Sequence, residues 1–353
     1  MISAIIAIIG RKADNMASDG IHSVSRTLIE TFVRKKLIEL KDNPERGTRN
    51  LVDMALNFSK GRFERRFFTA AQQMLQNEQS GYYTLAWDTI THVTLEHMLE
   101  FGMNVGYNSL NVGAKLIRER ETKCGHNIPW AVGLRVDGDM WDAMAQDYRA
   151  LLGQGREMGI YTWMARVSRR PEALLPMIEA EKDCAFVLLV EPDQATDAFL
   201  DAAAQLKNMM PVVGWGEACA DVCRRMRERE MLYSIYVPYD GMADVPYDAI
   251  LEDAAQMHPV ITMFVSDEAI EGRSADQGEA IGKLRAAQAY ATIPMELYAD
   301  SLMIDGIISD EACVAVFDES GTLINTKGRP LNFITTPLCD IFKAAYPKKK
   351  RNS

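Results

Sequence analysis

The feature that most constrains this chain is the alternation of short apolar runs with longer amphipathic stretches between residues 130 and 290. The runs have the length and composition of buried strands, and the stretches between them have helical spacing. A strand followed by a helix, six times in succession, indicates parallel strands that are buried on both faces. The apolar runs are 131–136, 160–165, 185–190, 211–214, 231–237 and 259–265.

Two architectures accommodate such units, a doubly wound open sheet and a full or partial barrel. The first run is not followed by Gly-x-Gly-x-x-Gly, the fingerprint of dinucleotide-binding open sheets, which weakens that option. Before residue 130 apolar residues recur at helical spacing, for example from Leu28 to Leu40, and no convincing strand is found. After residue 300, two β-rich runs flank a turn that contains Gly321, which is typical of a hairpin.

The chain therefore divides into three predicted regions. The first is a helical N-terminal subdomain, the second contains the β/α units, and the third contains the hairpin and a basic tail. Their boundaries are 1–126, 127–295 and 296–353.

Composition narrows the classes of function. The formal net charge of −10 argues against a general nucleic-acid binder, which needs positive surface to neutralise phosphates. Six scattered cysteines are too few for a disulfide framework and favour a reducing compartment. The apolar run 2–9 is far shorter than the roughly 20 residues of a bilayer span. We therefore expect a cytoplasmic protein with no membrane span and no nucleic-acid partner.

Taken together, these regions resemble one branch of the radical SAM superfamily, whose core is a six-unit partial barrel. The resemblance runs from about residue 25 to residue 330 and is carried by framework segments. It implies an α/β fold, a partial (β/α)6 TIM-like barrel with a helical N-terminal subdomain and a C-terminal β-hairpin extension. The matching segments are Asp42–Glu45 with Asn50-Leu51, Asn127–Ala131, Gln154–Tyr161, Lys207-Asn208 with Pro211-Val212, and the Gly321 turn.

The chain departs from this family in the loop after the first barrel strand. Family members carry Cys-x-x-x-Cys-x-x-Cys there, and the three thiolates hold a 4Fe–4S cluster that S-adenosylmethionine chelates. Here Val136–Asp142 lead directly into a helix, and no cysteine lies between Cys124 and Cys184. The loop is shortened as well as stripped of its ligands.

Two further ligand sets of the family are also absent. The Gly-Gly-Glu-Pro stretch that contacts the amino group of S-adenosylmethionine is replaced by Arg166–Pro171, which reverses the local charge. The hairpin positions at which many relatives carry cysteines hold Ile307 and Thr326. The resemblance therefore implies a degenerate member, for which we expect neither a 4Fe–4S cluster nor S-adenosylmethionine as cofactor.

Candidate site residues then come from the ends of the strands, which form the functional rim of such barrels. Basic and acidic side chains there either bind a small polar or anionic ligand or pair with one another. Three carboxylates in the turn after the first strand offer oxygen ligands for Mg²⁺, but no fourth ligand is identifiable, so we favour a polar loop in which Asp139 caps the following helix. The ligand-binding candidates are Asp137, Asp139, Arg166, Glu191, Glu217 and Tyr236. We assign no metal site, and the candidates for one are Asp137, Asp139 and Asp142.

Two other clusters point to packing rather than chemistry. Cys219 and Cys223 form the only close cysteine pair, but two thiols are half a metal site, so we interpret them as core residues. His92, Glu96 and His97 fall in one predicted helix, where His92 and His97 lack the spacing of a helical zinc pair. We interpret these histidines as exposed or satisfied within the core.

Three hypotheses of function follow. In the first, the chain is a non-catalytic binding or scaffold partner of an intact, paralogous radical SAM enzyme or of that enzyme's substrate. In the second, it is an enzyme of another class that uses rim carboxylates with a divalent metal. The third and least favoured is an active radical SAM enzyme with unusual cluster ligation. The sequence allows a homodimer and identifies no catalytic residue.

Overall fold

A computed structural model describes most of the chain from residue 21 to residue 348. The apolar run 2–9, the tail after Lys348 and the predicted hairpin residue Thr326 lie outside the described residues. No helix among the described residues is both long and apolar enough to cross a bilayer. The described ranges are 21–42, 76–239, 245–266, 273–309, 311–324 and 330–348, with a few positions between 46 and 73.

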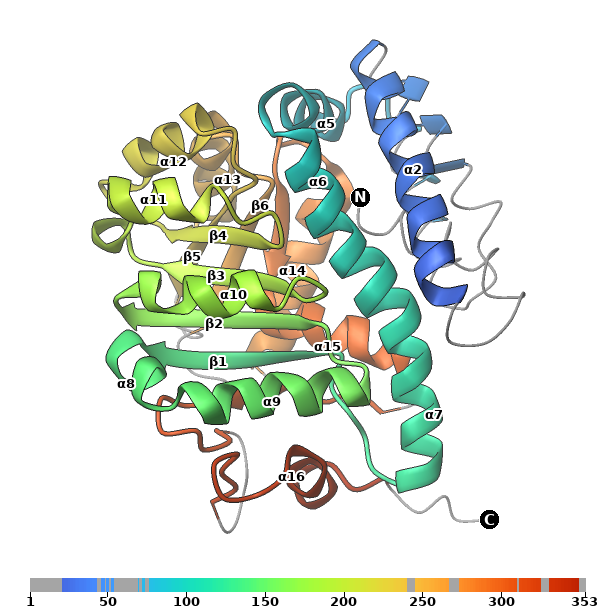
Figure 1. The fold of residues 1–353 in the computed structure, drawn as a ribbon. Coiled ribbons are helices and arrows are strands. Elements are labelled where there is room, and N and C mark those ends of the chain that lie inside the picture. The colour runs from blue at the N-terminus through green and yellow to red at the C-terminus, as the bar shows by residue number, and fades with distance from the viewer. Residues whose placement is uncertain are drawn as a thin grey trace.

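Eight parallel strands form a single sheet that curves into an open partial barrel (Figure 1). Neighbouring strands follow one another along the chain from β1 to β7, and β8 then pairs with the free edge of β1. The hydrogen-bonded order therefore begins at β7 and ends at β8, which leaves the barrel open between them. The strands are β1 Ala131–Asp137, β2 Thr162–Arg169, β3 Ala185–Val190, β4 Met209–Gly214, β5 Ser234–Tyr239, β6 Ile261–Ser266, β7 Ile293–Glu296 and β8 Ala315–Phe317.

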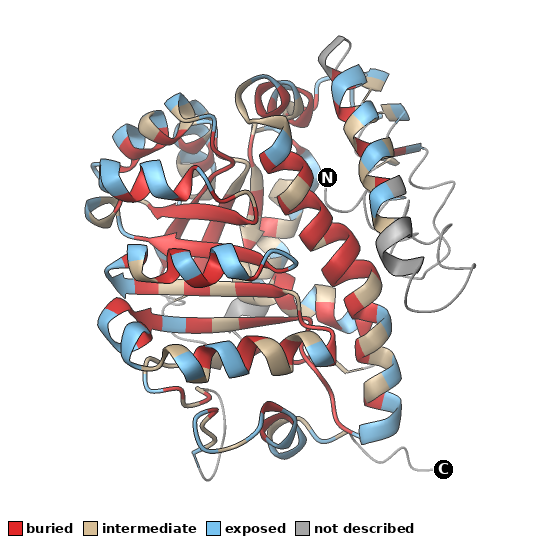
Figure 2. Cartoon of the chain, in the orientation of Figure 1, coloured by how far each residue is buried: buried red, intermediate tan, exposed pale blue. Residues whose placement is uncertain are grey.

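Helices cover the outer face of this sheet, and Figure 2 shows their buried sides turned toward the strands. Successive side chains of a strand point to opposite faces. Val132, Leu134 and Val136 accordingly pack in the outer core with Leu151 of α9, whereas Leu189 belongs to a second core inside the barrel. The helices that follow the strands are α8 Gly138–Ala143, α9 Ala145–Met158, α10 Leu175–Ala180, α11 Asp197–Ala203, α12 Cys219–Glu228, α13 Tyr247–Gln256, α14 Arg273–Ala287, α15 Leu297–Ile308 and α16 Leu338–Ala345, with short 3₁₀ turns at Pro171–Leu174 and Pro192–Gln194.

The N-terminal region is helical, as predicted. Ile29, Val33 and Leu37 of α2 are buried, and Arg34 pairs with Glu96 of α6. The single helix predicted to hold His92, Glu96 and His97 is interrupted, because the hydroxyl of Thr94 caps a new helix at the backbone N–H of His97. The helices are α2 Ile21–Asp42, α5 Gly81–His92, α6 Leu95–Met103, a π-helix over Asn104–Gly113, and α7 Ala114–Cys124.

The segment from α6 to α7 closes the N-terminal ends of the strands (Figure 1). The Asn104 side chain donates to the carbonyls of Lys182 and Cys184 at 2.7 and 3.0 Å. The ring of His97 contacts the carbonyl of Met209 at 2.6 Å. These polar side chains form hydrogen bonds with backbone carbonyls near the beginnings of the strands. A backbone carbonyl can be buried without a large cost only when it has such a partner. The floor of the barrel is therefore filled, and a ligand must approach from elsewhere.

The prediction of six strands was two short. β7 has four residues and includes Pro294, so it gives no periodic signal, and the three-residue β8 falls in the β-rich run that the sequence assigned to a hairpin. β8 is the first arm of the predicted hairpin. Phe317 does bridge antiparallel to Leu323 across a turn in which Gly321 has a φ of +82°, but the strand itself pairs with β1 in parallel. The predicted boundary at 295 falls inside β7, and the three-region division stays a prediction.

Candidate functional site

The inner face of β1 and β2 is partly open to solvent. Between Val132 and Val136 of β1 and between Trp163 and Val167 of β2, the side chains that point outward are buried, whereas Gly133, Met164 and Arg166 are half-buried and Arg135 is exposed. β3 and β4 are buried on both faces. An arginine in the middle of a sheet meets solvent only where the lumen beside it is hollow. The hollow therefore lies against β1 and β2.

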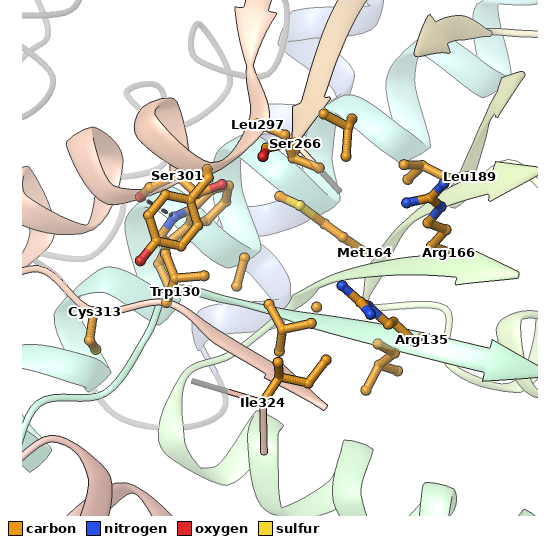
Figure 3. Close-up of a pocket in the computed structure, with 17 residues that line it drawn as sticks. Trp130, Arg135, Met164, Arg166, Leu189, Ser266, Leu297, Ser301, Cys313 and Ile324 are labelled. Carbon is orange, nitrogen blue, oxygen red and sulfur yellow. Dashed lines mark hydrogen bonds between the residues drawn. The ribbon is translucent and has the colours of Figure 1, made fainter. Parts of the chain in front are cut away.

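A cavity of about 130 Å³ occupies this part of the lumen (Figure 3). Its walls come from β1, β2, β3, β6 and α15 and from the chain on either side of β8, so it lies at the open side of the barrel. Met164 and Leu189 are among its apolar walls, and Ser301 contributes a hydroxyl. Arg135 and Arg166 project into it from neighbouring strands (Figure 3).

Three of the residues predicted from the strand ends come together beside this cavity. The Arg166 guanidinium lies 5.7 Å from the centre of the Tyr236 ring, and the Tyr236 hydroxyl donates to a Glu191 carboxylate oxygen. Burial, followed by the contact with Glu191, raises the pKa of Tyr236, so the hydroxyl remains a donor at neutral pH. A Cβ on Gly214 would lie 2.8 Å from the Glu191 carboxylate, so this glycine leaves room for the pair.

The three aspartates at the end of β1 and in α8 contact arginines and do not converge on one metal position. Asp137 caps α8 by accepting from the N–H of Asp139 at 2.9 Å, and Arg169 donates to its other oxygen at 2.6 Å. Desolvation raises the pKa of Asp137, but these hydrogen bonds outweigh it and hold the pKa below its usual range. Arg170 pairs with Asp139 and, at 3.1 Å, with Asp142. The helix cap is therefore Asp137, and the interpretation of Asp139 as the cap was wrong.

This arrangement gives the divalent-metal hypothesis no ligand set. Within the described part of the chain, no three His, Cys, Asp or Glu side chains converge as a metal site requires. Glu217 lies exposed in the turn between β4 and α12, and it does not line the cavity. Cys219 and Cys223 are both buried in α12, as expected of core residues.

The residues at the end of β1 do not fit an iron–sulfur cluster. Asp137 is the last residue of the strand and Gly138 the first of α8, so no loop separates them. A Cβ on Gly138 would lie 2.5 Å from the carbonyl oxygen of Arg170, so the turn packs directly against the chain after β2. A cluster needs closely spaced thiolates, and this turn offers carboxylates that are already bound to Arg169 and Arg170.

Sequence reasoning missed Arg135, Tyr298 and Ser301 as lining residues. Arg135 was detectable, because it is the one charged residue in the apolar run 131–136 and stands two positions after Gly133. Strand alternation places both residues on one face. Tyr298 and Ser301 belong to α15, a helix that was not predicted from the sequence.

No protein-family model matches this chain, and no curated protein sequence matches it. Among solved structures, Streptococcus suis SuiB bound to S-adenosylmethionine is 10% identical with a TM-score of 0.48, covering 64% of this chain and 68% of that one. SuiB bound to the precursor peptide SuiA is also 10% identical, with a TM-score of 0.48 and 70% of each chain covered. A third SuiB structure is 8% identical with a TM-score of 0.47, covering 79% and 76%. At these identities and TM-scores the likeness carries no conclusion about the activity of this chain.

Proposed function

We propose that this chain is a non-catalytic binding or scaffold protein on a radical SAM-like partial barrel, and that it holds no 4Fe–4S cluster and uses no S-adenosylmethionine. Its partner in this proposal is an intact, paralogous radical SAM enzyme or the substrate of that enzyme. The observation that carries this proposal is the end of β1. Asp137 is both the last residue of the strand and the cap of α8, and Arg169 donates to its carboxylate.

The energetics of the turn support this proposal. Arg169 contacts Asp137, and Arg170 contacts Asp139 and Asp142, so each of the three carboxylates at the turn has a guanidinium partner. Inserting a cluster would require a longer loop, three thiolates, and separation of Asp137, which is nine-tenths buried, from its guanidinium. Arg169 is exposed, so the cost of separating the pair falls on the Asp137 carboxylate, which would stay desolvated without its guanidinium.

The rest of the barrel supports a binding role. The outer core and the inner core are two apolar clusters, so the fold has a source of stability that involves no metal. The six cysteines are free thiols, and four of them are buried, which fits the cytoplasmic location we propose. The second copy of a homodimer is a further possible partner in this proposal.

Anaerobic reconstitution with iron and sulfide tests the proposal. The readouts are iron per chain and the visible absorption of an iron–sulfur cluster. Cys124 and Cys339 are the exposed thiols, so a Cys124→Ser/Cys339→Ser double variant separates surface-bound iron from a built cluster. We expect neither protein to assemble a stoichiometric cluster. Four irons per chain with cluster absorption in both proteins would contradict the proposal and favour a radical enzyme with unusual ligation.

A further inference from the structure

Two exposed cysteines lie at the ends of helices that are far apart in the sequence. Cys124 is the last residue of α7, Cys339 is the second residue of α16, and both are exposed. The other four cysteines are buried. An exposed thiol is open to oxidants, whereas a buried structural thiol is inert. Oxidation of this chain is therefore expected first at Cys124 and Cys339.

Backbone pairing holds the end of α7 beside the segment that follows α16. His126 bridges antiparallel to Pro347, and the Lys348 N–H donates to the Gly125 carbonyl at 3.2 Å. Gly125 directly follows Cys124, so the pairing begins next to that thiol. The fold therefore brings the end of α7 and the C-terminal segment around α16 together.

His126 contacts the second of these thiols. Its Nε2 atom lies 4.0 Å from the Cys339 sulfur, and His126 stands only two residues after Cys124. Only 1% of His126 is exposed, and burial, the largest influence, lowers the pKa of its ring. The ring is therefore neutral at neutral pH, and a neutral imidazole offers one nitrogen as a proton acceptor.

The Cys339 thiol needs a base before it can react. Partial burial raises the pKa of this thiol, and the neighbouring Cys124 and Asp340 raise it further, so the sulfur carries its proton at neutral pH. The thiolate, not the thiol, is the nucleophile. Arg120 and Lys343 have the opposite effect on this pKa, and their charges favour the thiolate after the proton has left.

We propose that Cys124 and Cys339 form a redox pair, in which hydrogen peroxide converts the two thiols into a disulfide that joins α7 to α16. His126 takes the proton of Cys339, and the thiolate attacks one peroxide oxygen, so that an S–O bond forms and the O–O bond breaks. The other oxygen takes the proton from His126 and leaves as water. Cys124 then attacks the Cys339 sulfenic acid, an S–S bond replaces the S–O bond, and a second water leaves. The two thiols lose two electrons and two protons, which reduce one peroxide to two waters.

The end of α7 has room for this reaction. A disulfide needs two Cα atoms within about 7 Å of each other. Gly125 has a φ of +73°, and a Cβ there would meet no atom within 4 Å, so the last turn of α7 has open space in which to adjust. The disulfide ties α16, whose apolar face packs in the outer core, to a second helix of that core. In a reducing compartment such a bond is transient, because thiol exchange reverses it.

Peptide mapping of the full chain is the first test. The protein is reduced, freed of reductant, treated with hydrogen peroxide and digested without further reduction. We expect one disulfide between the peptides that contain Cys124 and Cys339, in a chain that does not form covalent dimers on a non-reducing gel. Disulfides between chains, a disulfide to another cysteine, or no disulfide at all would overturn the inference.

Variants separate the roles of the three residues. With Cys124→Ser we expect no disulfide, and a Cys339 sulfenic acid that dimedone traps. With His126→Asn we expect the disulfide to form at least about tenfold more slowly at neutral pH, because general-base catalysis is lost. That deficit should shrink at higher pH, where the thiol ionises without a base. A wild-type rate in His126→Asn, or a deficit that does not change with pH, overturns the inference.

His92→Asn is the matched control, because His92 lies on α5 and contacts Asp88 at 3.3 Å rather than a thiol. We expect it to form the disulfide at the wild-type rate. A measurement on the unmodified chain covers a variant that does not fold. The oxidised wild type should unfold at higher urea than the reduced wild type, and a reductant should abolish that shift. Equal midpoints for the two forms mean that the disulfide does not fasten α16, and they overturn the inference.

Discussion

His97 is fully buried in the floor of the barrel, where Leu232 N–H donates to Nδ1 at 3.2 Å and Nε2 lies 2.6 Å from the Met209 carbonyl oxygen. Nδ1 therefore accepts and Nε2–H donates, which is a neutral ring. Burial lowers the pKa of His97 to about 4, against roughly 6.5 for an unfolded histidine. Between these values the unfolded chain binds a proton that the folded chain does not. The stability from neutral His97 is therefore complete above pH 6.5 and falls as the pH drops toward 4.

The variant His97→Gln tests this pH dependence. We expect it to be less stable than the wild type at pH 7.5 by about 1–3 kcal/mol, because one of two buried hydrogen bonds is lost. The difference between the two proteins should shrink as the pH falls from 6.5 to 4.5, since the variant has no ring to protonate. Urea unfolding at both pH values measures it, and a difference that stays constant would count against the assignment.

The residues of the candidate site were predictable to different extents. Arg166, Glu191 and Tyr236 were identified because each lies near the end of an apolar run, and the structure brings them together. Asp137 and Asp139 were both predicted as ligand-binding residues, and Asp139 was expected to cap the following helix. Which aspartate is the cap depends on the residue at which β1 ends. The sequence pattern ended the strand at residue 136 and the structure ends it at 137, so the cap moves with that single residue.

Helix α9 contains two glycines that the same substitution should affect in opposite ways. A Cβ on Gly155 would lie 2.5 Å from the ring of Trp163, which is fully buried on β2, whereas a Cβ on Gly153 meets nothing within 4 Å. We expect Gly155→Ala to destabilise the protein by about 1–3 kcal/mol through overpacking. Gly153→Ala should stabilise it by up to about 1 kcal/mol through helix propensity. Shifts of the same sign in thermal unfolding would contradict this geometry.

At the scale of elements, the sequence predicted where helices form but not their type. Apolar residues recur at helical spacing before residue 130, yet a π-helix occupies Asn104–Gly113. The reason lies outside the segment, because Asn104 and Asn108 satisfy carbonyls at Lys182–Cys184, and Gly113 packs against the backbone of Gly159. Local periodicity carries no information about such distant partners, which is why only the existence of the helix was predictable.

For the whole molecule, each of the six predicted apolar runs overlaps a strand of the sheet. Strands buried on both faces are apolar throughout, so they are visible without a partner. The way in which the barrel ends was not predictable, because β7 is too short to show a pattern and β8 was assigned to a hairpin rather than to the sheet. β8 pairs with β1, which lies far from it in the sequence, and a local pattern does not report such a pairing.

The last described helix is part of the barrel rather than an appendage. Leu338, Ile341 and Phe342 of α16 are fully buried in the outer core, and the Leu338 N–H donates to the Gln154 side chain of α9 at 2.7 Å. Each such side chain contributes about 1.5–3 kcal/mol when buried. Three of them are therefore comparable to the whole stability of a typical domain, roughly 5–15 kcal/mol.

We therefore expect a chain that ends at Thr336 to unfold at much lower urea than the full chain, or to fail to fold. A chain that ends at Lys348 is the matched control, because it keeps α16 and the ion pair of Lys348 with Glu121 at 3.3 Å. That control should unfold at the midpoint of the full chain. Urea unfolding followed by circular dichroism measures all three proteins. Equal midpoints for the Thr336 and Lys348 chains would mean that β1 and α9 hold together without α16, and that the barrel is complete before residue 337.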